Sequence, residues 1–389
     1  MTLNKTLRLV RSDGWLYGYT LVHEPLVAPQ RGRLASRVAF AAAHVVMDSL
    51  RTAEPLTSPV IDWEATLAYR EYLWSLGFGV AEAMDTAQRG AGLDWPHALD
   101  LIRRSTAAAG AHDALLACGA GTDHLSAGRA RSVQDVVDAY LRQCEQIEAA
   151  GGRIILMASR ALAALARHPD DYASVYDAVL SQVRQPVILH WLGPMFDPAL
   201  EGYWGAHDIA VATENCLRII SAHRAKIDGI KISMLDADLE ITMRRKLPPG
   251  VRMYTGDDFN YDRLILGDES GHSDALLGIF DAIAPAASLA LAALDAGDIP
   301  HYQELLAPTV PLSRHLFTSP TQHYKTGVVF LAYLNGFQSH FRMVGGYESA
   351  RSTAHLCELF VLADQARVLR DAELAVRRMQ NFLAIAGVA

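Results

Sequence analysis

A lysine interrupts a mostly apolar segment of the chain that runs from Ile227 to Ser233. A lysine inside a packed core loses its hydration, which favours the neutral amine and lowers the pKa of the side chain. A neutral amine can attack a carbonyl carbon, and the protonated imine that results is an electron sink for breaking a neighbouring carbon–carbon bond. The alternative is a lysine that pairs with a buried carboxylate or extends out of the strand. We favour the chemical role and predict that Lys231 forms an imine.

A histidine, His190, lies near the end of the preceding apolar segment, Val187–Leu192, just before a Gly-Pro turn. Imidazole can move a proton near neutral pH, and an imine mechanism requires proton transfer at several steps. The alternative is a core histidine bonded to a backbone carbonyl. Because its segment directly precedes that of Lys231, we favour a catalytic role for His190.

Polar residues also follow an earlier apolar segment, in the loop 82–90. Asp85 could act as a catalytic base or orient another group. Thr86, Gln88 and Arg89 could hold a substrate carboxylate, hydroxyl or phosphate, with Arg89 binding through two parallel hydrogen bonds. The alternative is a polar loop whose charges are solvated or cap the next helix.

Two further carboxylates, Asp257 and Asp258, follow the segment that comes after the lysine. One of them could recognise a substrate hydroxyl, or could hold a divalent metal ion together with His190 and Asp85. Capping of a helix that begins near Asn260 is the alternative. We predict that both aspartates contact the substrate.

Aromatic residues gather after the histidine and could form a lid or a wall on which a sugar stacks, although core packing is the commoner use. This set, in which Trp191 is a predicted substrate contact, comprises Trp191, Phe196, Tyr203 and Trp204. Weaker candidates, for which we favour a structural or supporting role, are His44, Asp48, Asp123, His124 and His272.

Short apolar runs alternate with amphipathic stretches along the chain, a pattern typical of βα units on a parallel sheet. Eight such runs favour a closed (β/α)8 TIM barrel of the α/β class over an open doubly wound sheet. No Gly-x-Gly-x-x-Gly motif follows an early strand, which argues against a dinucleotide-binding domain. The predicted strands are 38–47, 79–83, 114–118, 154–158, 187–192, 229–233, 251–255 and 273–279.

Both ends of the chain extend beyond the predicted barrel. An Asp-Gly pair between two apolar runs predicts an N-terminal β-hairpin. From residue 285 onward the pattern predicts helices only, over 285–296, 299–306, 325–337 and 349–386. We therefore divide the chain into an N-terminal extension (1–36), a barrel (37–297) and a C-terminal helical region (298–389), which could pack on the barrel or form a contact in a homo-oligomer.

The composition narrows the class of protein. In 389 residues, apolar types make up 51% and charged types 20%, the balance of a chain that buries a large core. A net charge of -8 without a basic block gives no electrostatic footprint for nucleic acid. We expect no signal peptide and no membrane contact, and the widely spaced cysteines indicate reduced thiols of a cytoplasmic protein.

The region 60–342 resembles the dihydrodipicolinate synthase and N-acetylneuraminate lyase family, class I aldolase-type barrels that act on 2-oxo acids and related carbonyl compounds. Gly229 and Lys231 match the family's Gly-x-Lys on the sixth strand. The resemblance therefore implies that Lys231 forms the imine. His190 stands where the family has a tyrosine on the fifth strand, and the segment 254–258 is similar to the family's Gly-Asp turn after the seventh.

The chain departs from the family at the second strand. There the family has a Gly-Thr-Thr-Gly-Glu loop that holds the substrate carboxylate, and only Thr86 keeps a hydroxyl in this sequence. We predict a Schiff-base-forming lyase or aldolase that cleaves or dehydrates a keto sugar, a keto sugar acid or a 2-oxo acid through Lys231, without a cofactor. The alternative is a metal-dependent barrel enzyme, such as a sugar isomerase, epimerase or hydrolase, with a divalent ion on Asp85, His190 and Asp257. A ligand-binding protein that has lost its chemistry ranks last.

Overall fold

The computed structural model describes residues 6–125 and 130–388. Within them the chain packs into two compact units. One unit, here the barrel unit, comprises residues 37–43 and 79–277, and the other, the helical unit, comprises residues up to 36, 44–78 and 278–389. Residues 44–78 and 278–297, predicted as part of the barrel segment, are thus grouped with the C-terminal helices.

The barrel unit contains eight parallel strands that close on themselves in the order β10-β3-β4-β5-β6-β7-β8-β9. The prediction of an eight-stranded (β/α)8 barrel is therefore confirmed. The strands are β3 (Ala39–Ala42), β4 (Gly79–Glu82), β5 (Leu116–Ala120), β6 (Arg153–Met157), β7 (Val187–Leu192), β8 (Ile227–Ser233), β9 (Arg252–Thr255) and β10 (Asp274–Leu277).

Side chains that point into the barrel form one apolar cluster, which includes Phe40, Ile155, Ile188, Tyr254 and Leu276. Successive side chains along a strand point to opposite faces. Because Ile188 points inward on β7, His190 on the same strand must point inward too. The apolar cluster thus fixes the direction in which polar residues farther along the strands face.

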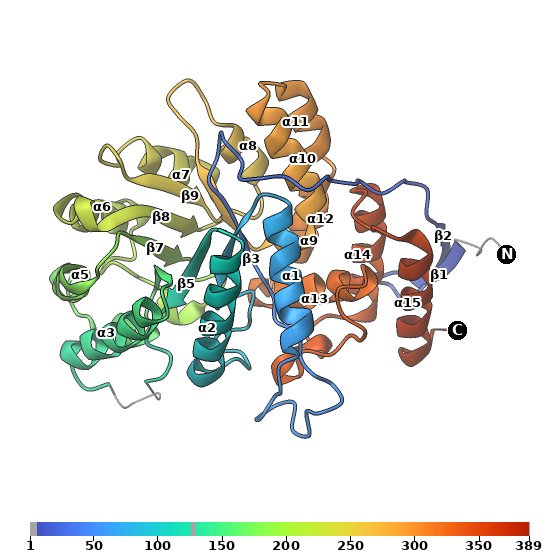
Figure 1. The fold of residues 1–389 in the computed structure, drawn as a ribbon, viewed down its shortest axis with the longest axis horizontal. Helices are drawn as coiled ribbons and strands as arrows, with labels where there is room; N and C mark the ends of the chain where they lie inside the picture. Colours follow the sequence, from blue (N-terminus) through green and yellow to red (C-terminus); the bar gives the residue numbers. More distant parts are fainter. Residues whose placement is uncertain (1–5, 126–129, 389) are drawn as a thin grey trace. The chain divides into compact units, whose positions relative to one another are not determined.

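Helices surround these strands in the barrel unit (Figure 1). Several begin at a residue whose side chain accepts a hydrogen bond from the first turn, as Asp94 and Ser132 do, the latter in a reciprocal capping box with Asp135. The helices are α2 (Trp95–Ala111), α3 (Val133–Ala149), α4 (Arg160–Leu165), α5 (Pro169–Gln182), α6 (Ile209–Ala222), α7 (Ala237–Arg244) and α8 (Tyr261–Leu266).

The helical unit contains the predicted hairpin, in which β1 (Thr6–Val10) pairs antiparallel with β2 (Leu16–Thr20). Gly14 has φ of 85° in the connecting turn, a conformation that glycine adopts without strain. The helices of this unit are α1 (Trp63–Ser75), α9 (Ile279–Ala282), α10 (Ala284–Asp295), α11 (Ile299–Leu306), α12 (Thr309–Leu316), α13 (Tyr324–Leu334), α14 (Thr353–Gln365) and α15 (Ala372–Ile385).

One predicted helix is wrong, because 349–386 is not continuous. The chain leaves the helical conformation after Gln365, Arg367 has φ of 60°, and Asp371 accepts the hydrogen bond that begins the next helix. An aspartate at the first position of a helix and a residue in the left-handed conformation both mark a boundary. In the part of the chain that the structure describes, no helix is long and apolar enough to span a bilayer.

Candidate active site

Lys231 lies on β8 and is only 7% exposed. Its side chain shares the inward face of the strand with Gly229 and Ser233, because the three alternate along β8. Burial lowers the pKa of Lys231 below its ordinary value of 10.5, while the nearby carboxylates of Asp85 and Asp258 oppose that shift. The side chain of Lys231 therefore loses its proton to become a neutral amine more readily than an exposed lysine does.

His190 lies beside this lysine on the neighbouring strand. In the register of β7 and β8, His190 is paired with Lys231. Burial, aided by the charge of Lys231, lowers the pKa of His190 well below 6.5. Its imidazole is therefore neutral at physiological pH, with one nitrogen that donates and one that accepts a hydrogen bond.

Ser233 completes this group and was not singled out from the sequence. Its side chain is 2% exposed, and its Oγ lies 3.4 Å from Nε2 of His190. The signal was present, because Ser233 follows Lys231 by one full period of a strand and so faces the same side. The site thus contains an amine, an imidazole and a hydroxyl on adjacent strands.

Gly256 makes room for these side chains. A Cβ at this position would lie 2.3 Å from Oγ of Ser233 and 2.6 Å from Cε of Lys231. Its backbone N–H donates to the carbonyl of Ile232, 2.8 Å away, which holds the turn against β8. The site therefore requires a glycine at this position of the predicted Gly-Asp turn, because a side chain would overlap with Ser233 and Lys231.

Asp258 and Asp257 follow this glycine and differ in their surroundings. Oδ1 of Asp257 accepts hydrogen bonds from the N–H groups of Phe259 and Asn260, and Oδ2 accepts one from the amide of Asn260. Asp257 therefore holds the turn, as in the capping alternative. Asp258 is buried and close enough to act on the charge of Lys231.

Asp85 lies in the loop after β4, half-buried, and its charge also acts on Lys231. Thr86 is buried in the same loop. Gln88 is buried as well, and its amide donates to the carbonyl of Ala91 3.1 Å away, which closes the loop on itself. The structure thus brings Asp85 towards the lysine, whereas Gln88 has a local bond.

Arg89 is used within the protein. Its Nε and Nη2 bind the two carboxylate oxygens of Asp123 at 2.7 Å, Nη2 also donates to Gln143, and Nη1 donates to the carbonyls of Ala83 and Gly119. Every N–H of the guanidinium thus has an acceptor. This favours a role in shaping the loop over the predicted contact with substrate.

Asp123 belongs to the same network. Burial alone would raise the pKa of Asp123, but the guanidinium of Arg89 outweighs it and holds that pKa below its ordinary value. Gln143 donates to Asp123 at 3.1 Å and lies 2.8 Å from Nδ1 of His124. These bonds favour the supporting role expected for Asp123 and His124.

Trp191 points away from the barrel interior, because it alternates with His190 along β7. Its ring packs edge-on against Trp204, with centroids 6.2 Å apart. Trp204 also lies 5.1 Å from Tyr203, in an aromatic layer outside the strands. This placement favours core packing over the predicted substrate contact of Trp191.

The remaining weaker candidates are His44, Asp48 and His272, and the first two have local partners. In the helical unit, Nδ1 of His44 lies 2.8 Å from Oδ2 of Asp281. Asp48 pairs with Arg51 and accepts hydrogen bonds from the backbone that follows it. His272 is an exposed residue, but part of its ring is buried, and this burial lowers the pKa of the imidazole.

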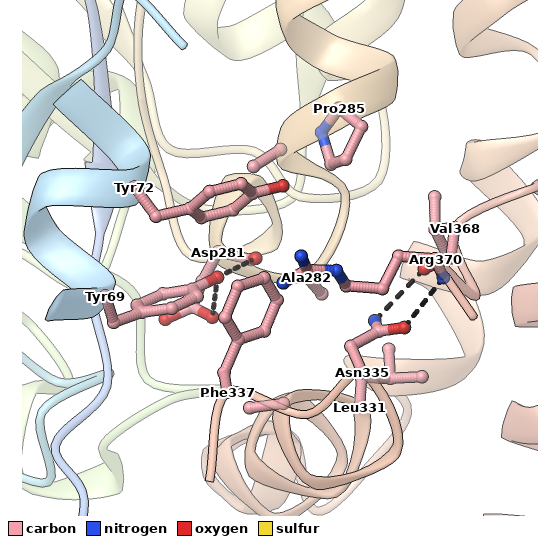
Figure 2. A pocket seen from close by; sticks show the side chains of 12 residues that line it. Tyr69, Tyr72, Asp281, Ala282, Pro285, Leu331, Asn335, Phe337, Val368 and Arg370 are labelled. Carbon is pink, nitrogen blue, oxygen red and sulfur yellow. Dashed lines mark hydrogen bonds between the residues drawn. The ribbon is translucent and has the colours of Figure 1, made fainter. Parts of the chain in front are cut away.

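Asp281 also accepts a hydrogen bond from Tyr69 in a small cavity of about 10 Å³ (Figure 2). That volume is about enough for one water molecule. Across the cavity, the guanidinium of Arg370 lies 4.7 Å from the ring centre of Phe337. The side chains that line this pocket of the helical unit therefore leave space for about one water molecule.

A buried carboxylate, Glu240 on α7, also escaped the sequence analysis. Burial raises its pKa to about 8, although hydrogen bonds from Ser273 and Thr255 favour the ionised form. Ser273 donates to Oε1 at 2.7 Å. At neutral pH the Glu240 carboxyl is therefore mostly protonated.

A cavity of about 620 Å³ opens in the barrel unit, and Asp85 and His190 form part of its wall. Cavities of about 300–1,000 Å³ are typical of small-molecule sites. The same two residues also belong to the surroundings of Lys231. The cavity and the buried lysine are thus linked through Asp85 and His190.

No group of three or more His, Cys, Asp or Glu side chains within residues 6–125 and 130–388 is arranged to hold a metal ion. Asp85, His190 and Asp257 are accordingly not gathered into such a group, and the metal-dependent alternative stays a prediction.

Solved structures of the dihydrodipicolinate synthase family share this fold. YagE, a prophage protein of that family from E. coli K12 solved in complex with pyruvate, has a TM-score of 0.65 and 13% identity over 85% of this chain and 99% of its own. Dihydrodipicolinate synthase from Aquifex aeolicus has a TM-score of 0.63 and 13% identity over 86% and 99%. That from Bacteroides thetaiotaomicron has a TM-score of 0.63 and 13% identity over 85% and 99%.

The TM-scores of these structures establish a common fold, as the resemblance in the sequence predicted. No curated protein matches the sequence. The family model described as "Protein of unknown function (DUF993)" matches residues 7–388, nearly the whole chain. The chain therefore belongs to the DUF993 family, and its barrel has the fold of the dihydrodipicolinate synthases.

Proposed function

We propose that the protein is an imine-forming lyase or aldolase in which Lys231 attacks the carbonyl carbon of a 2-oxo acid or a related keto compound. The observation that carries this proposal is the placement of Lys231, buried inside the barrel beside His190 with a lowered pKa. A desolvated lysine reaches the neutral, nucleophilic state more easily than one in water. The complex of YagE with pyruvate supports a 2-oxo acid as the carbonyl partner.

The first stage forms the imine. The lone pair of the neutral Nζ of Lys231 bonds to the carbonyl carbon, and a proton moves from Nζ to the carbonyl oxygen to give a carbinolamine. A second proton converts the hydroxyl into a leaving water, and its departure leaves the protonated imine. His190 and Ser233, 3.4 Å apart, are the groups placed to relay these protons.

The second stage breaks a bond next to the imine. The imine carbon is C2 of the substrate, and the hydroxyl lies on C4. A base removes the proton of this hydroxyl, and C4 becomes a carbonyl. The electron pair of the C3–C4 bond moves into the imine to give an enamine. Protonation of the enamine carbon and addition of water then release the oxo acid and restore the lysine. Asp85 is half-buried in the cavity wall and close enough to act on Lys231, which fits the role of this base.

Exchange of hydrogen for deuterium on pyruvate tests the proposal without knowledge of the full substrate. An imine with Lys231 makes the methyl hydrogens of pyruvate acidic, so the protein should catalyse their exchange in deuterium oxide, followed by proton NMR. The Lys231→Met variant should lose the exchange, and the Ser233→Ala variant should retain part of it.

The same assay separates the metal-dependent alternative. The exchange should persist after treatment with a chelator, because a lysine imine needs no metal ion. Exchange that disappears with the chelator and returns with a divalent ion would favour the alternative. Exchange at an unchanged rate in Lys231→Met would refute the proposed function.

A further inference from the structure

His190 and Asp85 lie in the wall of the cavity of about 620 Å³ and also beside Lys231. Away from these two residues, the cavity wall is mostly apolar. On α4, Ala161, Ala164 and Leu165 line it. Their spacing of three and four residues places them on one face of the helix. Further apolar side chains of the wall come from the ends of β6 and β7 and from the short helix Pro198–Leu200, among them Met157, Leu192 and Leu200.

Several polar side chains of this outer wall have partners within the protein. Arg89 is paired with Asp123, as described above. Nε of Arg160 lies 2.5 Å from Oδ2 of Asp197 at the exposed edge of the wall. Thr122 and Ser159 share a hydrogen bond of 2.6 Å between their hydroxyls.

The α4 face decides which kind of group lies well against it. A hydroxyl that leaves water for the side chains of Ala161, Ala164 and Leu165 loses hydrogen bonds that these side chains cannot replace. An apolar group gains by the same transfer. This face therefore favours an apolar tail over the hydroxylated tail of a sugar acid.

The size of the cavity is consistent with a second substrate group. Its volume of about 620 Å³ lies within the range typical of small-molecule sites. A three-carbon oxo acid fills only a small part of it. The space that remains is large enough for an aromatic ring or an alkyl chain.

We propose that the substrate joins a 2-oxo acid head, which reaches Lys231, to an apolar alkyl or aromatic tail that lies along the α4 face formed by Ala161, Ala164 and Leu165. This inference rests on the proposed function and narrows its substrate class. It also replaces the keto sugar expected from the sequence with a hydrophobic 4-hydroxy-2-oxo acid. Cleavage of such a compound breaks the bond between C3 and C4, gives an aldehyde from C4, and leaves the electron pair on the enamine of the oxo acid.

Two aldol compounds with the same head and different tails test this inference. They are 4-hydroxy-2-oxo-4-phenylbutanoate, with an aromatic tail, and 4,5,6-trihydroxy-2-oxohexanoate, with a hydroxylated one. Borohydride reduction traps the imine whether or not the bond breaks, so the concentration that gives half-maximal labelling of Lys231 is measured for each. One methylene group in an apolar pocket changes discrimination by roughly tenfold or more. We expect half-maximal labelling at a concentration at least about 100-fold lower for the phenyl compound.

A variant that fills the cavity provides the structural test. Ala164 is exposed in the free protein, so Ala164→Phe can be accommodated by the fold while its ring occupies the space of the tail. Ala107→Phe, at an exposed alanine of α2 that does not line the cavity, is the matched control. Ala164→Phe should weaken labelling by the phenyl compound roughly tenfold or more and leave labelling by pyruvate unchanged. Ala107→Phe should change neither.

The outcomes separate the two proposals. Equal labelling by both aldol compounds, with no effect of Ala164→Phe and normal labelling by pyruvate, would overturn the apolar tail and leave the imine mechanism standing. No labelling of Lys231 by pyruvate or by either compound would overturn both. Weakened labelling by pyruvate in Ala164→Phe would show that this face belongs to the oxo acid head, which also overturns the assignment of the tail.

Discussion

Replacement of Gly256 by alanine tests how tightly the barrel holds its reactive lysine. The new methyl group would lie 2.3 Å from Oγ of Ser233, 2.6 Å from Cε of Lys231 and 2.7 Å from the carbonyl oxygen of Ile232. Favourable contacts between such atoms lie at about 3.5–4.0 Å. The overlap is therefore about 1 Å with three neighbours at once. The turn cannot withdraw freely, because its N–H is bonded to Ile232.

The expected magnitudes follow from this overlap. Overpacking of a buried site costs about 1–3 kcal/mol, so the thermal midpoint should fall by several degrees while the barrel still folds. A displacement of about 1 Å at a reacting group lowers the rate by roughly 100-fold. We therefore expect borohydride labelling of Lys231 by pyruvate to slow by roughly 100-fold in Gly256→Ala.

A control and a double variant sharpen this test. Gly110 lies in α2, and no atom lies within 4 Å of the position that an added methyl group would take, so Gly110→Ala should be neutral or stabilising and label at the normal rate. Adding Ser233→Ala to Gly256→Ala removes one of the three overlaps and should restore part of the thermal stability but little of the labelling. Normal labelling by Gly256→Ala alone would show that the position of Lys231 is not set by this turn and would refute the reasoning.

Three further changes have defined outcomes. Burial lowers the pKa of Lys231 below 10.5, so the unfolded chain binds the proton of this side chain more tightly than the folded protein does. Lys231→Met removes this penalty and should therefore raise the thermal midpoint at pH 7 while abolishing labelling. Glu240 has a pKa raised to about 8 from 4.5, so its contribution to stability is present below about pH 4.5 and lost as the pH rises through about 8; Glu240→Gln should remove that part of the pH dependence in thermal melts. Arg89→Met leaves the carboxylate of Asp123 without its charged partner and should cost about 3 kcal/mol in chemical denaturation, and an unchanged stability would contradict the assigned role of Arg89.

Much of the barrel could be predicted from the sequence, because an inward-facing strand needs an apolar run of definite length. β7 begins and ends at the predicted residues, Val187 and Leu192. Boundaries set by single backbone conformations were harder to predict. The break after Gln365 depends on the left-handed conformation of Arg367, and arginine is not a residue type that indicates this conformation.

The candidate site was predicted in part for a similar reason. A lysine inside an apolar strand stands out, and the structure pairs it with His190 in register. What the sequence could not provide is which polar groups already have partners. Arg89 looks like a ligand for a carboxylate until its bonds to Asp123 and to backbone carbonyls are known, and Trp191 faces outward because of its place in the strand alternation.

The contributions that the sequence did not reveal came from small side chains. In the sequence, Ser233 is marked only by its position two residues after Lys231, and Gly256 only by its likeness to the family's Gly-Asp turn. Their roles follow from a distance of 3.4 Å to His190 and from the space that the lysine side chain occupies. Such roles require coordinates, because the residues meet only when adjacent strands are in register.

Imine formation at Lys231 is tested directly by a borohydride trap with mass analysis of the Lys231 peptide. The protein is incubated with pyruvate, longer 2-oxo acids and keto sugars, reduced and digested. We predict a mass increment on Lys231 that corresponds to the reduced imine and is absent from Lys231→Met. A compound that the protein converts without any adduct at Lys231 would contradict it.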